Sequence, residues 1–150
     1  MPDIGHHIGI DAPPARVYEA LASTDGLRKW WTRTVEGEST VGGSLKFFFR
    51  NPEPSAVMEV VALDPERRVE WRCAQGPDEW VGTTLTFELN SGDGDGETFV
   101  RFTHGNWDEL TDFMRHCSTK WAYFLLGLKI LLEGGPSVAF PDDAPISSWG

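Results

Sequence analysis

The histidine at position 104 ends the run Val-Arg-Phe-Thr-His and is the residue best suited to acid–base chemistry. Alternation along a β-strand places His104 on the same face as Val100 and Phe102, so we expect its imidazole to point inward. An imidazole in a cavity can hydrogen-bond a ligand carbonyl or transfer a proton near neutral pH. The alternative is a histidine in the core or at its rim, beside Trp107, whose hydrogen bonds are all satisfied.

Glu59 is the second candidate for catalysis, and the sequence leaves its orientation open. It lies in the run Val-Met-Glu-Val-Val-Ala-Leu, which is apolar on both sides, so alternation does not assign it to a face. If it faced inward, its carboxyl group would have a raised pKa and could act as a general base. If it faced outward, it would be an ordinary charge on a sheet surface, which is the interpretation we favour.

Two cysteines, Cys73 and Cys117, lie 44 positions apart, and neither belongs to a Cys-x-x-Cys pair. In a cytosolic setting we expect two buried, reduced thiols rather than a disulfide. His116 precedes Cys117, but neighbours on a helix point in different directions, so adjacency does not make them a nucleophile and its base. The acidic, glycine-rich run at 93–97 lacks the closing glutamate of a calcium loop, and no zinc or nucleotide motif is present. We therefore expect no metal and no cofactor.

The charge balance argues against several classes of partner. Thirteen basic and twenty-three acidic residues give a net charge of −10, which opposes binding to nucleic acid or anionic lipid. No run approaches the roughly 20 apolar residues of a membrane helix, so we expect no membrane insertion. The N-terminus lacks the basic and apolar regions of a secretory signal, so we expect a cytoplasmic protein. The sequence does not distinguish a monomer from a homodimer.

Changes in hydrophobic period divide the chain into the elements that must position these residues. Residues 3–11 alternate as a half-buried strand, and residues 12–24 and 24–31 have the spacing and capping residues of two short helices. The runs with the length and alternation of antiparallel strands are 42–51, 55–65, 67–75, 79–90 and 97–107, to which 36–43 could add one more. The longest helical pattern extends from Trp107 to Glu133 and ends at Gly134-Gly135-Pro136.

This order of elements predicts an α+β fold. A curved antiparallel sheet would pack its apolar face against one long C-terminal helix, and two short helices would follow the first strand. With 150 residues, 40% of them hydrophobic, the chain can form one domain with a substantial core. We place this domain at residues 1–136 and expect residues 137–150 to form an irregular tail.

Several segments carry a family resemblance: IDAPPARVYEALASTDGLRKWW near the start, CSTKWAYFLLGLKILLEGG near the end, and VEWRC, WVGTTLTFEL and VRFTHGNW between them. Over residues 6–136 the chain resembles the START-like (Bet v 1-like, SRPBCC) superfamily. Within it, the chain is similar to proteins of the activator-of-Hsp90-ATPase-homologue type, which are often called polyketide cyclases. The resemblance implies a helix-grip fold with a cavity between the long helix and the sheet. Members bind lipids, hormones or polyketides there, and some catalyse cyclisation or dehydration, so fold alone does not decide function.

Alternation and helical spacing predict which side chains would surround such a cavity. Most of them are aromatic, which suits an apolar ligand that carries rings. The predicted ligand-binding residues are Trp31, Phe47, Phe49, Trp71, Cys73, Leu85, Phe87, Phe102, His104, Phe113, Cys117 and Trp121. The alternative is that these rings fill the space and leave no cavity, since protein cores are close-packed.

Trp30 and Trp31 form a pair whose roles should differ. Adjacent residues on a helix point about 100° apart, so we expect that the two rings cannot both face one core. Trp30 shares a helix face with Leu27 and should anchor the core. Trp31 then turns toward the rim of the cavity or toward solvent, and at the rim it would border the ligand.

Our leading hypothesis is that the protein binds a hydrophobic small molecule, lipid-like or polyketide-like, between the sheet and the long helix. One alternative is a cyclase or lyase that uses His104 as its acid or base. Another is a protein-interaction module, such as a chaperone cofactor, which would present an apolar patch outside the cavity.

Overall fold

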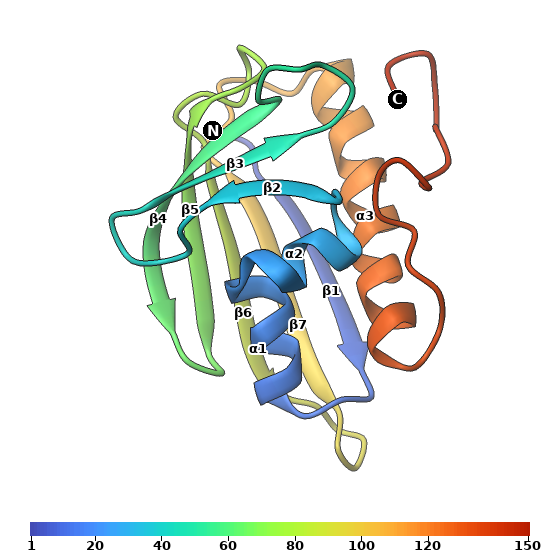
Figure 1. Ribbon diagram of the computed structural model, residues 1–150. Helices are drawn as coiled ribbons and strands as arrows, with labels where there is room; N and C mark the ends of the chain where they lie inside the picture. The colour runs from blue at the N-terminus through green and yellow to red at the C-terminus, as the bar shows by residue number, and fades with distance from the viewer.

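A seven-stranded antiparallel sheet forms the frame of the molecule, and the computed structural model describes all of residues 1–150. The strands are β1 (Ile4–Ile10), β2 (Thr34–Gly37), β3 (Ser44–Phe48), β4 (Ala56–Asp64), β5 (Arg68–Gln75), β6 (Thr84–Ser91) and β7 (Thr98–Gly105); the helices are α1 (Pro14–Ala22), α2 (Thr24–Trp30) and α3 (Asp112–Leu132). In space the strand order is β1-β7-β6-β5-β4-β3-β2, so the first two strands of the chain form the two edges. This is the predicted α+β, helix-grip arrangement, with α3 lying against the sheet (Figure 1).

Strand alternation sorts the side chains of the sheet between an inner and an outer face. On β5, Val69, Trp71 and Cys73 are completely buried, whereas the intervening Glu70 and Arg72 reach solvent. The same pattern continues on the neighbouring strands, because the register pairs Trp71 of β5 with Leu85 of β6. The inner face is therefore a continuous apolar layer against which the helices pack.

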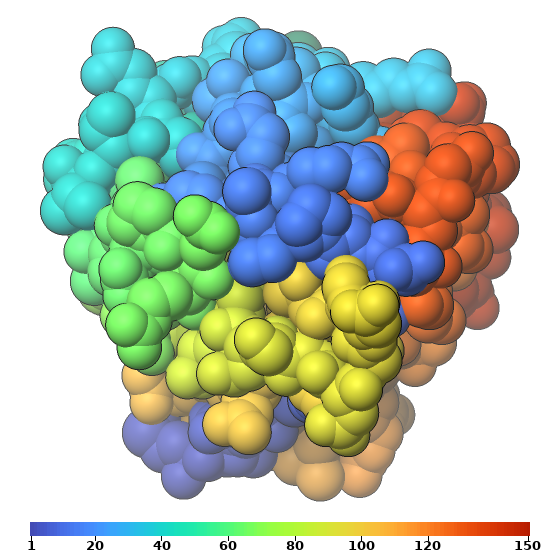
Figure 2. Space-filling view, turned by 90° about the horizontal axis from the view of Figure 1, so that it is seen from below, coloured from blue at the N-terminus to red at the C-terminus, as the bar shows by residue number.

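Helices α1 and α2 cover one end of the inner face. Ser23 caps α2 by accepting a hydrogen bond from the backbone N–H of Gly26 at 2.9 Å. A Cβ atom on Gly26 would lie 2.5 Å from the carbonyl oxygen of Glu19 in α1, so this contact requires glycine. The indole of Trp30 then donates to the carbonyl oxygen of Ala20 at 2.8 Å. Seen from this end, α1 lies between the β4–β5 turn and the β6–β7 turn (Figure 2).

Helix α3 begins later than the sequence pattern predicts. Its N-cap is Thr111, whose hydroxyl accepts a hydrogen bond from the backbone N–H of Met114 at 3.1 Å. Trp107 and Leu110 match the helical spacing but lie in the preceding loop, where Leu110 is exposed. Trp107 is instead buried, and its indole donates to the carbonyl oxygen of His104 at 3.0 Å. No helix has the length and apolar content needed to span a membrane.

Two strand boundaries also differ from the prediction. The short strand expected at 36–43 is β2, which starts at Thr34 and ends at Gly37, where φ is +110°. Strand β6 starts at Thr84 instead of residue 79, because the preceding residues form a turn. In this turn the backbone N–H of Trp80 donates to the carbonyl oxygen of Pro77 at 2.8 Å. The turn lifts Trp80 out of the sheet and toward α3.

Residues 137–150, the C-terminal segment, have an irregular backbone. They run back along α3, so that their end lies near the first half of that helix (Figure 1). The backbone N–H of Phe140 donates to the carbonyl oxygen of Trp31 at 3.0 Å, and Arg33 donates back to Phe140 at 3.1 Å. These bonds fix the segment to the end of α2, so it packs on the domain.

Candidate functional site

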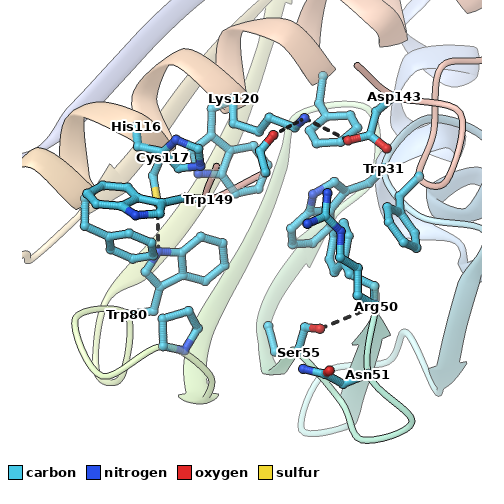
Figure 3. Close-up of a pocket in the computed structure, with 18 residues that line it drawn as sticks. Trp31, Arg50, Asn51, Ser55, Trp80, His116, Cys117, Lys120, Asp143 and Trp149 are labelled. Carbon is cyan, nitrogen blue, oxygen red and sulfur yellow. Dashed lines mark hydrogen bonds and ion pairs between the residues drawn. The ribbon is translucent and has the colours of Figure 1, made fainter. Parts of the chain in front are cut away.

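A pocket of about 310 Å³ lies at the end of the molecule away from α1. Its walls come from the end of α2, the β3–β4 loop, the β5–β6 turn, the first half of α3 and the C-terminal segment (Figure 3). Its aromatic lining consists of Trp31, Phe49, Trp80, Phe113, Trp121, Phe124, Phe140 and Trp149, and its polar lining of Arg50, Asn51, Ser55, His116, Lys120 and Asp143. The site is therefore an aromatic pocket with a few polar groups, a combination typical of sites for small molecules.

Trp31 forms the inner wall of the pocket. Its ring centroid lies 4.9 Å from that of Trp121 and 5.7 Å from that of Phe49, and both of these residues line the pocket. Behind it, the ring stacks on Trp71 with centroids 6.2 Å apart. Trp31 is only 3% exposed, so it stands at the boundary between the packed core and the pocket.

The expectation that Trp30 and Trp31 cannot share one core is wrong. Trp30 is 1% exposed and Trp31 is 3% exposed, and both belong to the same hydrophobic cluster. Helix α2 ends at Trp30, and Trp31 already has the different backbone angles of a C-cap (φ −106°, ψ −69°). Since the core surrounds the end of this short helix, both rings are buried, 6.3 Å apart and nearly parallel.

Trp80 and Trp121 continue the wall that Trp31 begins. Their rings stack with centroids 6.1 Å apart at an interplanar angle of 18°. The indole of Trp80 donates to the sulfur of Cys117 at 3.4 Å, which ties the β5–β6 turn to α3 (Figure 3). Burial raises the pKa of Cys117 to about 12, so this thiol is protonated at neutral pH and is a poor nucleophile.

His104 lies behind this wall in a fully satisfied hydrogen-bond network. The indole N–H of Trp121 donates to Nδ1 of His104 at 3.1 Å, so Nε2 carries the proton and donates to the hydroxyl of Thr83 at 2.8 Å. That hydroxyl donates in turn to the carbonyl oxygen of Trp80. Burial lowers the pKa of His104 to about 3, so the imidazole is neutral at physiological pH. Both ring nitrogens are engaged in holding Trp121 and the β5–β6 turn.

Lys120 is the only lysine of the pocket, and its ammonium group is almost enclosed. Its side chain is 16% exposed and pairs at 2.7 Å with the carboxylate of Asp143, which is 10% exposed. The same ammonium group donates to the carbonyl oxygens of Ala144 at 2.7 Å and Gly150 at 3.1 Å. It also lies 5.3 Å from the ring centroid of Phe124. The C-terminal segment therefore supplies all the acceptors for this cation.

The end of the C-terminal segment closes part of the pocket mouth. The ring of Trp149 lies 6.2 Å from that of Phe113 and 5.6 Å from that of His116. The hydroxyl of Ser147 is 3.2 Å from Nδ1 of His116. Burial and the Lys120 ammonium lower the pKa of His116, so this ring is neutral near pH 7. Trp149 itself remains 59% exposed, so it is a surface contact and not part of the core.

The family model for "Activator of Hsp90 ATPase homolog 1-like protein" matches residues 11–133. The chain belongs to this family. The family match covers α1 to α3 and ends just before the C-terminal segment. Among curated proteins there is no significant match.

Solved structures of similar proteins agree with this assignment. The Aha1 dimer from Colwellia psychrerythraea shares 47% sequence identity, covers 90% of this chain and 98% of its own, and has a TM-score of 0.79. An HSP90 activator from Plasmodium falciparum is 18% identical, with 87% of this chain and 96% of that chain covered and a TM-score of 0.72. CalU16 from Micromonospora echinospora is 16% identical, with 88% and 76% covered and a TM-score of 0.71. The last two show a shared fold only.

The predicted ligand-binding residues divide into two groups. The structure brings Trp31, Phe49, Phe113, Cys117 and Trp121 together around the pocket. Those that do not line it and are completely buried in the core are Phe47, Trp71, Cys73, Leu85, Phe87, Phe102 and His104. The rings of this second group pack on one another; Phe87, for example, lies 5.0 Å from Phe102 between ring centroids. The interface between the helices and the sheet therefore contains both a close-packed core and an open pocket.

Glu59, the other predicted catalytic residue, lies on the outer face of the sheet. Its side chain is 52% exposed, and its carboxylate is 3.9 Å from the guanidinium of Arg72. This is the outward orientation that we favoured, and it separates Glu59 from the pocket. The structure contains no group of three or more His, Cys, Asp or Glu side chains that could hold a metal ion.

Pocket residues that sequence reasoning did not select include Trp80, Arg50, Lys120 and Trp149. The alternating pattern predicts a strand at Trp80, whereas the Gly-Pro-Asp sequence before it indicates the turn that carries this residue in the structure. Lys120 lies three residues after Cys117 and four before Phe124 on α3, and this spacing places it on the pocket side of the helix. No periodic pattern pointed to Arg50 or Trp149, which lie in irregular segments.

Proposed function

We propose that the protein binds a hydrophobic small molecule in the aromatic pocket. The observation that carries this proposal is a continuous aromatic surface, in which Trp31 packs on Trp121 and Trp121 stacks on Trp80, beside an open pocket. The volume of about 310 Å³ is near the lower end of the range for ligand sites, so a compact ligand fits best. Aromatic walls favour a body that carries rings or a flexible chain.

A cyclase or lyase with His104 as its acid or base has less support. The imidazole is shielded from the pocket by Trp121 and Trp80, and both of its nitrogens are already hydrogen-bonded. A group with a pKa of about 3 is also far from the value that suits proton transfer near pH 7. The pocket is better suited to holding a molecule than to transforming it.

The indole N–H signals of the seven tryptophans provide a direct test. In a ¹H–¹⁵N NMR titration with N-phenyl-1-naphthylamine, a neutral aromatic probe, we expect the signals of Trp80, Trp121 and Trp149 to shift most. Trp30 and Trp107 lie outside the pocket and should shift least. A matched pair of variants, Trp149→Ala in the pocket and Leu126→Ala on the exposed side of α3, should respectively weaken and preserve the effect. Unshifted pocket signals, or largest shifts at Trp30 and Trp107, would contradict the proposal.

A chaperone-cofactor function is the second candidate, and the 47% identity with an Aha1 protein favours it. Leu126 and Ile130, one turn apart on α3, are 51% and 48% exposed and form an apolar surface outside the pocket. Purified Hsp90 should hydrolyse ATP faster when the protein is added, and Leu126→Ser with Ile130→Ser should reduce the increase. An unchanged ATPase rate with the unmodified protein would contradict this candidate.

We also propose that the chain forms a homodimer, as the Colwellia psychrerythraea relative does. Sedimentation equilibrium at micromolar concentration should then give twice the 16.7 kDa mass of one chain. A single species at the monomer mass over the whole concentration range would contradict it.

A further inference from the structure

The pocket of the proposed function combines aromatic walls with two cations, and we propose that its ligand is an apolar acid. The body of this ligand would lie against the tryptophans, and its carboxylate would bind Lys120 and Arg50. This inference rests on the proposed function, because it specifies the chemical class of the molecule that the pocket takes.

Lys120 is a preformed anion site inside an apolar surface. The ammonium group has three hydrogens, and they are directed at Asp143, Ala144 and Gly150 of the C-terminal segment. Neither the sheet nor the helices supply an acceptor for it. The folded domain therefore provides a cation beside the pocket, and the irregular C-terminal segment provides the counter-charge.

Arg50 supplies a second cation at the same mouth. It lies in the β3–β4 loop, is exposed, and takes part in none of the nine ion pairs of the structure. Its guanidinium lies beside Gly150, at the end of the same segment that covers Lys120. Figure 3 shows Arg50 and the Lys120–Asp143 pair on the side of the pocket that carries Trp31. A guanidinium without a carboxylate partner can bind a carboxylate through two parallel hydrogen bonds.

The charge of the pocket differs from that of the chain as a whole. The chain has a net charge of −10, yet the charged side chains that line the pocket are Arg50, Lys120 and a single carboxylate, that of Asp143. Removing one partner of an enclosed ion pair is costly, because it leaves the other charge without compensation. A ligand carboxylate can replace Asp143 as the counter-ion of Lys120, so that the ammonium group stays compensated while the C-terminal segment carries Asp143 into solvent. Asp143 is then an internal competitor for the ligand's acid group.

Two probes of nearly equal shape test the proposal. 1-Naphthylacetate carries a carboxylate that is ionised at pH 7, and 1-naphthylacetamide replaces it with a neutral amide. By isothermal titration calorimetry on the full chain, we expect the acid to bind about tenfold more tightly than the amide. Lys120→Met should remove most of this preference, so that the affinities for the acid and the amide become similar. Lys129→Met is the matched control, because Lys129 lies on the same helix, pairs with Glu133 and is outside the pocket.

Two further variants test the proposal even if Lys120→Met does not fold. Arg50 is exposed, so Arg50→Met should fold normally and reduce the preference for the acid over the amide by about threefold. Asp143→Asn removes the competing carboxylate, and it should strengthen binding of the acid by about threefold.

The outcomes separate this inference from the function on which it rests. Equal affinities for the two probes would overturn the inference and leave the proposed function standing. A preference for the acid that survives both Lys120→Met and Arg50→Met would also overturn the inference, because the carboxylate would then bind elsewhere. If neither probe binds and N-phenyl-1-naphthylamine does not bind either, the proposed function fails and the inference fails with it.

Discussion

The interface between the helices and the sheet has two halves of similar composition and different openness. In the closed half, Trp30, Trp71 and Phe87 pack ring against ring and are at most 1% exposed. In the open half, Trp31 and Phe49 belong to the same inner face of the molecule but border a pocket. Aromatic content is therefore not what separates a filled core from a ligand site in this fold.

The covering element explains the difference between the two halves. Over the closed half, α1 and α2 approach each other at Gly26 without a gap and place Trp30 against Phe87. Over the open half lie the β3–β4 loop and the C-terminal segment, which have no regular hydrogen-bond ladder. Regular helices can pack at crystal-like density, whereas these irregular segments touch the rings at a few points only.

The largest expected difference between the halves is in stability. Phe87→Ala, in the closed half, should lower the free energy of unfolding by about 3–5 kcal/mol, because it leaves a cavity among fully buried rings. Phe49→Ala, in the open half, should cost about 1–2 kcal/mol, since solvent can already reach that ring from the pocket. Urea unfolding followed by circular dichroism measures both values. Equal losses for the two variants would show that the halves do not differ in packing.

The second effect concerns pH and the buried histidine. The pKa of His104 is lowered by burial to about 3 in the folded protein, whereas an unfolded histidine titrates near its model value of 6.5. Below pH 6.5 the unfolded chain therefore binds a proton that the folded chain does not, so stability falls as the pH decreases. This contribution is absent above pH 6.5 and amounts to about 1.4 kcal/mol per pH unit below it.

A variant without the imidazole isolates this contribution. Between pH 6.5 and pH 5, the unmodified protein should lose about 2 kcal/mol more stability than His104→Gln, as measured by urea unfolding at each pH. Parallel pH profiles for the two proteins would contradict the buried, neutral state of His104 and would return this residue to the list of candidate acids and bases.

How much of the fold and of the candidate site could be predicted from the sequence depends on which half of the interface a residue occupies. Alternation correctly placed Trp71, Phe87 and Phe102 on the inner face, because strand geometry fixes the side on which each side chain lies. It could not separate them from Phe49, which alternates in the same way but lies under a loop. The distinction between a core residue and a pocket residue depends on how the irregular segments fold. Their sequence has no hydrophobic period from which this fold could be predicted.

The same reasoning applies to the polar residues. The sequence predicts that His104 faces inward, because it alternates together with Val100 and Phe102 along the strand. The structure shows this orientation. Its hydrogen bonds to Thr83 and Trp121 could not be predicted, because these partners come from a turn and a helix that are distant in sequence. Lys120 and Arg50 were overlooked for a related reason: their common surroundings exist only when the C-terminal segment folds back on α3.

The smallest effect on stability should accompany a measurable effect on binding. Trp149→Ala removes an exposed ring at the pocket mouth, so the free energy of unfolding should change by about 0.5 kcal/mol or less. The affinity for N-phenyl-1-naphthylamine should nevertheless fall by about 0.5–1.5 kcal/mol, the value of one aromatic contact. Fluorescence titration of the probe measures the loss. An undiminished affinity would exclude Trp149 from the residues that contact the ligand. The contact surface would then consist of Trp31, Trp80 and Trp121.

Intermolecular nuclear Overhauser effects between N-phenyl-1-naphthylamine and the protein test the central claim most directly, because they locate the bound molecule in one half or the other. The account predicts contacts from the probe to Trp31, Trp80 and Phe113 and none to Phe87 or Phe102. Contacts to Phe87 or Phe102 would mean that the closed half opens to receive the ligand, and they would contradict the assignment of the site to the aromatic pocket.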